Sequence, residues 1–273
     1  MINFSGCYTA LITPMNRDHQ VDYEGLQNLV DFQLKNGAKG VLAVGTTGES
    51  PTLDWAEHNK VIEKICEYSA KTPCIAGTGS NSTQETIDAT AHAHEVGVRA
   101  VLLVDPYYNG PSSLEIRREY IEPIARKFPD TQVIPYIIPG RTGTQLLPQD
   151  LAILHQQFPN VSTVKEATGD LKNMELTRQV CGENFTILSG DDDKTYTMMV
   201  SPDIRASGVI SVVSNVAPRA VADMVHYIQD GNEEAAAVIQ QALQPLFGIV
   251  TVKTTEQTPY GPVACKARNP LAY

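Results

Sequence analysis

Lys165 is a cation in a segment that otherwise reads as a buried β-strand. It follows the run VSTV at residues 161–164, whereas the other lysines lie in helix-like or loop-like sequence. An ammonium group in a protein interior loses its hydration, so it must pair with a carboxylate or lower its pKa. A neutral amine in such a place attacks a ketone and forms a Schiff base. Alternatively, Lys165 marks the strand's end and reaches solvent or a nearby aspartate, and pattern alone does not separate the two.

The segment GTTGES at residues 45–50 suggests a second kind of chemistry. It resembles a phosphate cradle but lacks the GK[ST] ending of a nucleotide-binding loop, so nucleotide binding is disfavoured. The hydroxyls of Thr46 and Thr47, with backbone amides in a glycine-flanked turn, suit a smaller anion such as a carboxylate. An ordinary turn that leads into the next helix is the alternative interpretation.

Three tyrosines and one arginine follow other apolar runs. Tyr107, Tyr108 and Tyr136 lie at expected strand ends, where a phenol hydrogen-bonded to a hydroxyl such as Thr47 can relay protons. Tyrosines that line a barrel or an interface are nevertheless commoner than catalytic ones. Arg141 follows a Pro-Gly turn, and its planar guanidinium suits a substrate carboxylate, although a solvated loop arginine has the same spacing.

Short apolar runs alternate with longer helix-like segments, and these elements must position the polar residues. Because the runs lack a polar face, they are typical of parallel strands that helices cover on the outside. Helical spacing is clear at residues 23–34 and 57–68. The expected strands are residues 9–13, 40–44, 73–77, 100–104, 132–138, 161–164, 185–188 and 207–213.

Eight βα units within about 230 residues predict a closed (β/α)8 barrel, a TIM barrel of the α/β class, ahead of a doubly wound open sheet. The active site of such a barrel lies where the strands end, and the residues named above fall there. We expect the barrel over residues 1–224 and a small C-terminal helical extension over residues 225–273. Helix-like sequence runs up to Tyr273, which leaves open that the extension is truncated.

Charge and composition exclude several classes of partner. The net charge of -10 at pH 7 opposes binding to nucleic acid or to an anionic membrane. No apolar stretch has the length of a membrane span and the N-terminal residues lack a secretory pattern, so we expect a cytoplasmic protein. The cysteines lack metal-ligand spacing, so we expect reduced, mostly buried thiols and no metal site; they are Cys7, Cys66, Cys74, Cys181 and Cys265.

Five motifs together resemble those of the dihydrodipicolinate synthase and N-acetylneuraminate lyase family of class I, pyruvate-dependent aldolases. The resemblance runs over essentially the whole chain, and it is specific because the motifs occur in the family's order. The matching segments are GTTGES at residues 45–50, DPYYN at 105–109, YIIPGRTG at 136–143, VKEATGD at 164–170 and LSGDD at 188–192.

The resemblance implies catalytic roles. Lys165 corresponds to the lysine that captures pyruvate as a Schiff base, so this lyase chemistry requires neither a metal nor an organic cofactor. Tyr136 corresponds to the residue that donates and accepts protons at the imine. Thr47, Tyr136 and Tyr108 correspond to a proton relay in which Tyr108 comes from a neighbouring subunit. The resemblance also suggests a homotetramer built as a dimer of dimers.

The resemblance also implies substrate contacts. Thr46 and Thr47 would hold the pyruvate carboxylate, while Gly190 and Ile210 correspond to residues with backbone contacts near the bound keto acid. Arg141 fits the synthases that bind the carboxylate of L-aspartate 4-semialdehyde, which favours the reaction of the diaminopimelate and lysine pathway.

Two other functions remain open from the sequence. One is a different aldolase of the family, acting on N-acetylneuraminate or a 2-keto-3-deoxy sugar acid, and the other is a barrel that binds a keto acid without catalysis. One residue departs from the family pattern, since Ile137 stands where asparagine is common. Because strand neighbours face opposite sides, we expect this change to spare the barrel interior.

A further set of residues matches an allosteric site of lysine-inhibited family members. The resemblance therefore suggests inhibition by L-lysine, although Trp55 and His58 also suit simple packing on a helix face. The matching residues are Ser50, Trp55, His58, Asn81, Glu85 and Tyr107.

Overall fold

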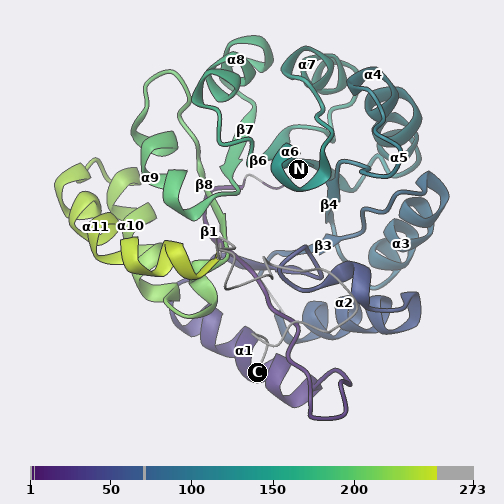
Figure 1. Ribbon diagram of the computed structural model, residues 1–273, viewed down its shortest axis with the longest axis horizontal. Coiled ribbons are helices and arrows are strands. Elements are labelled where there is room, and N and C mark those ends of the chain that lie inside the picture. The colour runs from purple at the N-terminus through teal and green to yellow at the C-terminus, as the bar shows by residue number, and fades with distance from the viewer. Residues whose placement is uncertain (1, 3, 70–71, 251–273) are drawn as a thin grey trace, which may run out of the picture.

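The computed structural model describes residues 2, 4–69 and 72–250 of the chain. Its centre is a closed barrel of parallel strands, in which each strand pairs with the next and β8 pairs with β1 (Figure 1). The predicted (β/α)8 barrel is confirmed, and the open doubly wound sheet is wrong. The strands are β1 (Gly6–Ala10), β2 (Gly40–Ala43), β3 (Cys74–Gly77), β4 (Ala100–Val104), β5 (Gln132–Ile137), β6 (Thr163–Glu166), β7 (Thr186–Ser189) and β8 (Gly208–Ser211).

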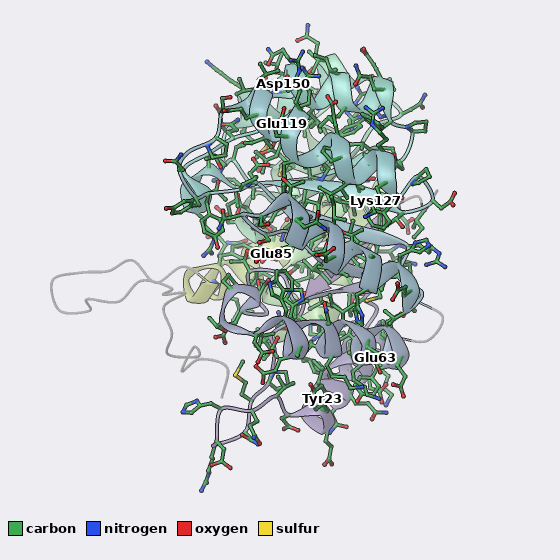
Figure 2. The ribbon with its side chains drawn as sticks, turned by 90° about the vertical axis from the view of Figure 1, so that its right-hand side faces the viewer. Tyr23, Glu63, Glu85, Glu119, Lys127 and Asp150 are labelled. Atoms are coloured by element: carbon green, nitrogen blue, oxygen red, sulfur yellow. The ribbon has the colours of Figure 1, made fainter. Side chains whose placement is uncertain are left out.

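Helices surround the barrel, and charged side chains such as Glu119 and Lys127 lie on their outer side (Figures 1 and 2). The helical elements are α1 (Tyr23–Lys35), η1 (Ser50–Thr52), α2 (Trp55–Ser69), α3 (Thr83–Glu95), α4 (Ser113–Glu115), η2 (Ile116–Ile121), α5 (Glu122–Lys127), α6 (Pro139–Thr142), α7 (Pro148–Gln157), α8 (Leu171–Cys181), α9 (Asp192–Val200), η3 (Val213–Asn215), α10 (Pro218–Gln229) and α11 (Glu233–Val250).

The strands carry apolar residues on both faces, as expected for a parallel sheet covered by helices. On β4, Leu102 belongs to the cluster that fills the barrel, whereas Val101 and Leu103 belong to the cluster between strands and helices. The same alternation puts Tyr136 inside the barrel and Ile137 outside. The expectation that the Ile137 departure spares the barrel interior is therefore confirmed.

The first strand begins three residues earlier than the apolar run at residues 9–13 suggests. It starts at Gly6, which pairs with Gly208 of β8, and a Cβ on Gly208 would lie only 2.0 Å from the Gly6 carbonyl oxygen. The barrel closes at this pair of glycines, a close approach that apolar patterning does not detect. Thr13 instead lies in the following loop, where its hydroxyl donates to the Gly48 carbonyl at 2.7 Å.

The last described helices extend beyond the closed barrel. The expected boundary between residues 224 and 225 falls inside α10, which packs on β1 and β8, and α11 packs on α9 and α10. The expected extension from residue 251 onward lies outside the described residues. No helix in the described part of the chain has the length and apolar character needed to cross a membrane. Cys7, Cys66, Cys74 and Cys181 are free thiols, and Cys265 lies beyond the described part.

Candidate active site

A cavity of about 860 Å³ opens at the carboxyl ends of the barrel strands. It is lined by Thr46 after β2, by Tyr136 near the end of β5 and by Arg141 after β5. Because enzymes with this fold build their active sites at this end of the barrel, the cavity is the candidate active site. Among the described residues, no group of histidine, cysteine and carboxylate side chains has the arrangement of a metal site.

Lys165 lies in β6 and faces the barrel interior, with Tyr136 on β5 and Leu188 on β7 as its register neighbours. It is 4% exposed, and its Nζ lies 4.1 Å from the centroid of the Tyr136 ring. Burial lowers the pKa of Lys165 to about 8, although the charges of Asp192 and Asp191 oppose the change. The alternative that Lys165 reaches solvent is therefore wrong. A buried amine that loses its proton readily is suited to attack a carbonyl carbon.

Tyr136 lines the cavity next to Lys165. Burial raises the pKa of its phenol, while a hydrogen bond with the Thr46 side chain and the positive charge of Arg141 act in the opposite direction. The phenol is thus protonated at neutral pH and ready to donate. Thr46 is the threonine whose hydrogen bonding lowers the pKa of the Tyr136 phenol, whereas the family resemblance puts Thr47 in the relay.

Gly190 lies directly against the lysine. A Cβ on Gly190 would lie 3.1 Å from Lys165 Cε and 2.8 Å from Ala167 Cβ, so a side chain at this position would press on the amine-bearing chain. The Gly190 amide also donates to the Glu166 carbonyl at 2.8 Å. The residue predicted from its family position is thus near the amine, and its lack of a side chain leaves room for the Lys165 side chain.

Asp192 follows Gly190 after one residue and is held firmly. Its carboxylate accepts from the Ser211 hydroxyl and from the amides of Val212 at 2.9 Å and Val213 at 3.1 Å. It therefore fastens the end of β8 to the start of α9 and keeps a negative charge near Lys165. Ile210 lies in β8 directly before Ser211 and is buried in the cluster that fills the barrel. The family resemblance predicts that its backbone lies near the bound keto acid.

Glu166 lies on the outer face of β6, opposite to the face that carries Lys165. Although it follows Lys165 directly, it faces outward, where its carboxylate accepts from the Thr168 amide at 2.8 Å and from Asn173 Nδ2 at 3.2 Å. Burial raises its pKa to about 6. These bonds fix the loop between β6 and α8, so Glu166 supports the site from outside the cavity.

The loop that carries Arg141 is tied to the end of β4. Thr144 Oγ1 donates to the Pro106 carbonyl at 2.8 Å, and the Leu146 amide donates to Asp105 Oδ2 at 2.9 Å. Asp105 is fully buried, and burial raises its pKa to about 8. Sequence reasoning did not single out Asp105, although a carboxylate directly after a buried apolar strand is a usable signal.

Asn81 organises the loop after β4. Its Oδ1 accepts from the amides of Tyr107 at 2.8 Å and Tyr108 at 2.9 Å. The Tyr108 side chain is 79% exposed and does not line the cavity. Within one chain, then, Tyr108 is not brought to Tyr136.

Five of the six residues matched to an allosteric site line this cavity, and Asn81 does not. Ser50 Oγ lies 3.2 Å from His58 Nε2, and the Trp55 and His58 rings meet edge to face at 4.9 Å between centroids. Burial lowers the pKa of His58 to about 4, so this imidazole is neutral at neutral pH. Its Nδ1 has no hydrogen-bond partner among the described residues. We call Ser50, Trp55, His58, Glu85 and Tyr107 the far wall.

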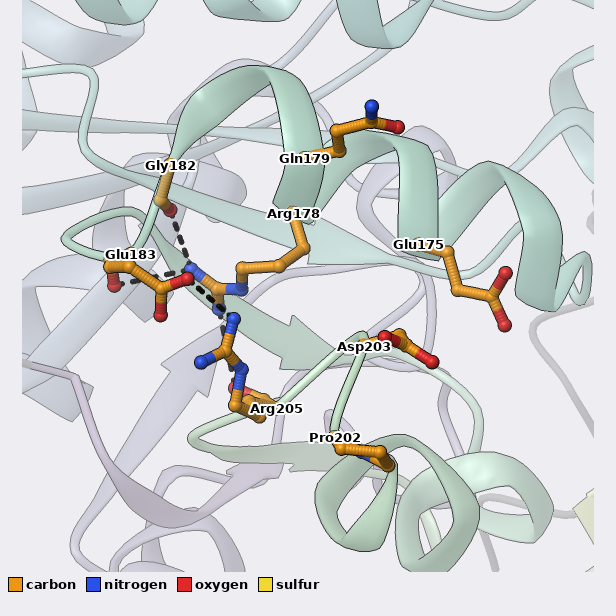
Figure 3. A pocket seen from close by; sticks show the side chains of 8 residues that line it. All are labelled: Glu175, Arg178, Gln179, Gly182, Glu183, Pro202, Asp203 and Arg205. Carbon is orange, nitrogen blue, oxygen red and sulfur yellow. Dashed lines mark hydrogen bonds and ion pairs between the residues drawn. The ribbon is translucent and has the colours of Figure 1, made fainter.

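A second cavity, of about 390 Å³, lies at the opposite end of the barrel, between the end of α8 and the segment before β8 (Figure 3). Arg178 dominates it and donates to five backbone carbonyls, including those of Gly182 at 2.8 Å and Phe185 at 2.7 Å. Arg205 pairs with Glu183 at 2.6 Å. Because both guanidinium groups already have partners, this cavity has a structural role.

Comparisons with known proteins agree with the geometry. The model of the dihydrodipicolinate synthetase family matches residues 3–261. A 4-hydroxy-tetrahydrodipicolinate synthase from Methanococcus maripaludis is 39% identical over 250 residues, which cover 91% of this chain and 84% of the relative. The crystal structure of a dihydrodipicolinate synthase from Acinetobacter baumannii complexed with pyruvate is 33% identical, with a TM-score of 0.86 over 93% of this chain and 86% of that chain. The enzyme from Cyanidioschyzon merolae with lysine bound is 33% identical, with a TM-score of 0.87 over 93% of this chain and 85% of that chain.

Proposed function

The chain belongs to the dihydrodipicolinate synthetase family, and we propose that it condenses pyruvate with L-aspartate 4-semialdehyde, the 4-hydroxy-tetrahydrodipicolinate synthase reaction of lysine biosynthesis. The observation that carries this proposal is Lys165, a buried amine with a lowered pKa against Tyr136 at the active end of the barrel. A pathway that consumes metabolic pyruvate also gives a reason to expect the protein in the cytoplasm.

The first step is Schiff-base formation. The neutral Lys165 amine attacks the keto carbon of pyruvate, and the resulting carbinolamine loses its hydroxyl as water. The Tyr136 phenol donates the proton that this leaving hydroxyl needs, and Thr46 keeps the phenol in place through their hydrogen bond. The hydroxyls and amides of the loop with Thr46 and Thr47 would hold the pyruvate carboxylate.

The second step forms the carbon–carbon bond. Loss of a proton from the methyl group of the iminium gives an enamine, whose terminal carbon adds to the aldehyde carbon of the second substrate. Arg141 lines the same cavity, and its guanidinium would bind the carboxylate of that substrate. A guanidinium at this place favours an amino-acid semialdehyde over the neutral polyol tail of a sugar aldehyde.

Assembly completes the relay in this proposal. Tyr108 is exposed and its backbone is held by Asn81, so its side chain stands on a fixed loop where a neighbouring subunit could receive it. We expect a homotetramer, a dimer of dimers, in which each Tyr108 reaches the site of a neighbour. An isolated subunit would then form the Schiff base but turn over slowly.

The far wall gives a reason to expect inhibition by L-lysine. The Glu85 carboxylate suits an ammonium group, and the half-exposed Trp55 ring suits an aliphatic stem. The lysine-bound relative from Cyanidioschyzon merolae supports the same expectation. Calorimetric titration with L-lysine should release heat of binding, and L-lysine should reduce turnover in the activity assay. Glu85→Gln should weaken both the binding and the inhibition. Absence of heat and of inhibition would remove this part of the proposal.

Turnover assays test the choice of reaction. The purified protein with pyruvate should consume aspartate semialdehyde and release a cyclic product, while N-acetylmannosamine and sugar-derived aldehydes should give little product. Arg141→Lys and Arg141→Leu should both raise the KM for aspartate semialdehyde, with Leu the worse because it also removes the charge. Preference for a sugar aldehyde would instead assign the protein to another branch of the aldolases.

A further inference from the structure

Asp191 lines the catalytic end of the cavity, yet none of the steps above uses it. It follows Gly190, against which the Lys165 side chain lies, with 3.1 Å between Lys165 Cε and a Cβ built on Gly190. Because Asp191 lines the cavity and follows Gly190 directly, it lies in the wall beside the Lys165 side chain.

The Asp191 carboxylate has no hydrogen-bond partner within the described part of the chain, although its backbone has several. Its amide donates to Ser189 Oγ, and its carbonyl accepts from Ser189 Oγ at 2.9 Å and from Thr195 Oγ1 at 3.0 Å. It is the N-cap residue of α9 but makes no side-chain capping bond. By contrast, the N-cap residues Asp22 and Asp170 accept from backbone amides of α1 and α8. A free carboxylate at a position that normally caps a helix is available for a ligand.

The charges around the cavity are complementary but unpaired. Asp191 raises the pKa of Lys165, and Arg141 and Lys165 in turn lower that of Asp191, although burial raises it overall. No described ion pair joins Asp191 to either cation. Asp192 is different, because Ser211 and two backbone amides already occupy its carboxylate. Asp191 and Arg141 thus present one free anion and one free cation to the same space.

An α-amino acid head group carries the matching pair of charges. Resting on the proposed function, we propose that Asp191 binds the ammonium group of the amino-aldehyde substrate while Arg141 binds its carboxylate. Asp191 is then the residue that selects an aldehyde with an amine. Its position beside Lys165 also suits the last step, because ring closure requires that amine to reach the carbon bonded to Lys165 Nζ.

In the ring-closing step, Asp191 accepts the proton that the substrate ammonium must lose. The substrate ammonium gives a proton to the Asp191 carboxylate, and its nitrogen lone pair attacks the iminium carbon. A bond from the substrate nitrogen to this carbon forms, the bond from the carbon to Lys165 Nζ breaks, and Lys165 leaves as the amine after a proton moves to it from the new nitrogen. No oxidant or metal enters the step.

The test compares two aldehydes on the pyruvate-loaded enzyme. Aspartate semialdehyde carries the amine, and succinic semialdehyde is the same aldehyde and carboxylate without it. With Asp191→Asn, kcat/KM for aspartate semialdehyde should fall at least about tenfold, as expected for loss of a charge-assisted contact. The concentration of succinic semialdehyde that half-saturates borohydride-trapped adduct formation should change less than about twofold.

The matched control is Asp203→Asn, which removes an exposed carboxylate beside the second cavity, at the opposite end of the barrel. It should leave both aldehydes unaffected. A general effect of Asp191→Asn on Lys165 would impair the reactions of both aldehydes equally. Equal impairment with the two aldehydes, or no impairment with either, would therefore overturn the proposal. Asp191→Ser, which can cap α9, serves as a second variant should Asn fold poorly. Failure of the proposed function is recognised separately, since the unmodified protein would then either form no pyruvate adduct or turn over a sugar aldehyde in preference to aspartate semialdehyde.

Discussion

The Nζ atom of Lys165 lies 4.1 Å from the centroid of the Tyr136 ring, on adjacent strands of the barrel. The ring shields the amine from water on one side and carries the phenol that can give or take a proton beside it. A ring face attracts an ammonium only modestly, so burial decides the protonation state. The pair brings nucleophile and acid together on two hydrogen-bonded strands of the barrel.

Lys165→Met should raise stability while abolishing function. The pKa of Lys165 falls from an ordinary value of 10.5 to about 8, so at pH 7 keeping the charged amine buried costs up to about 3 kcal/mol. Thermal unfolding at pH 7 should show a higher Tm for Lys165→Met, and Lys172→Met, on the surface, should show no change. A lower Tm for Lys165→Met would mean that the amine is stabilised by a partner.

The rate of adduct formation should depend on pH through Lys165. Below about pH 8 the folded protein holds Lys165 protonated, and the nucleophile is scarce. Trapping with pyruvate and cyanoborohydride should therefore accelerate as pH rises through about 8 and level off above it. A midpoint near the ordinary lysine value would contradict the lowered pKa.

The two adjacent threonines should separate in their kinetic effects. Thr46→Val removes the hydrogen bonding to the Tyr136 phenol, so kcat should fall by about tenfold or more. Tyr136→Phe removes the phenol itself and should lower kcat further. Thr47→Val should act mainly on the KM for pyruvate. If Thr47→Val instead lowers kcat more than Thr46→Val, the relay runs through Thr47, as the family resemblance suggests.

Asn81 should control turnover without touching the amine. Asn81→Ala removes the acceptor for the amides of Tyr107 and Tyr108 and frees the loop, so turnover should fall several-fold. Asn81→Asp keeps an oxygen at the same place and should restore most of the rate. The rate of pyruvate adduct formation at Lys165 should stay unchanged in both variants, and parallel losses in adduct formation would refute the positioning role.

Much of the fold and part of the site follow from local sequence. Buried parallel strands are apolar on both faces, which is why the barrel and the unusual Lys165 can be recognised. Which threonine meets Tyr136 depends on the loop backbone, where Val44 and Glu49 have positive φ, and no periodicity encodes that. Asn81 and Asp105 act on segments 26 to 41 residues away, so only the folded chain reveals their partners.

Peptide mapping after incubation with pyruvate and borohydride tests directly whether Lys165 forms the Schiff base. Reduction converts a Schiff base into a stable secondary amine, so the modified residue can be identified by mass spectrometry. We expect a single pyruvate-derived adduct per chain, on Lys165, and none in Lys165→Met. A folded protein that forms no adduct, or one modified at another lysine, would contradict it.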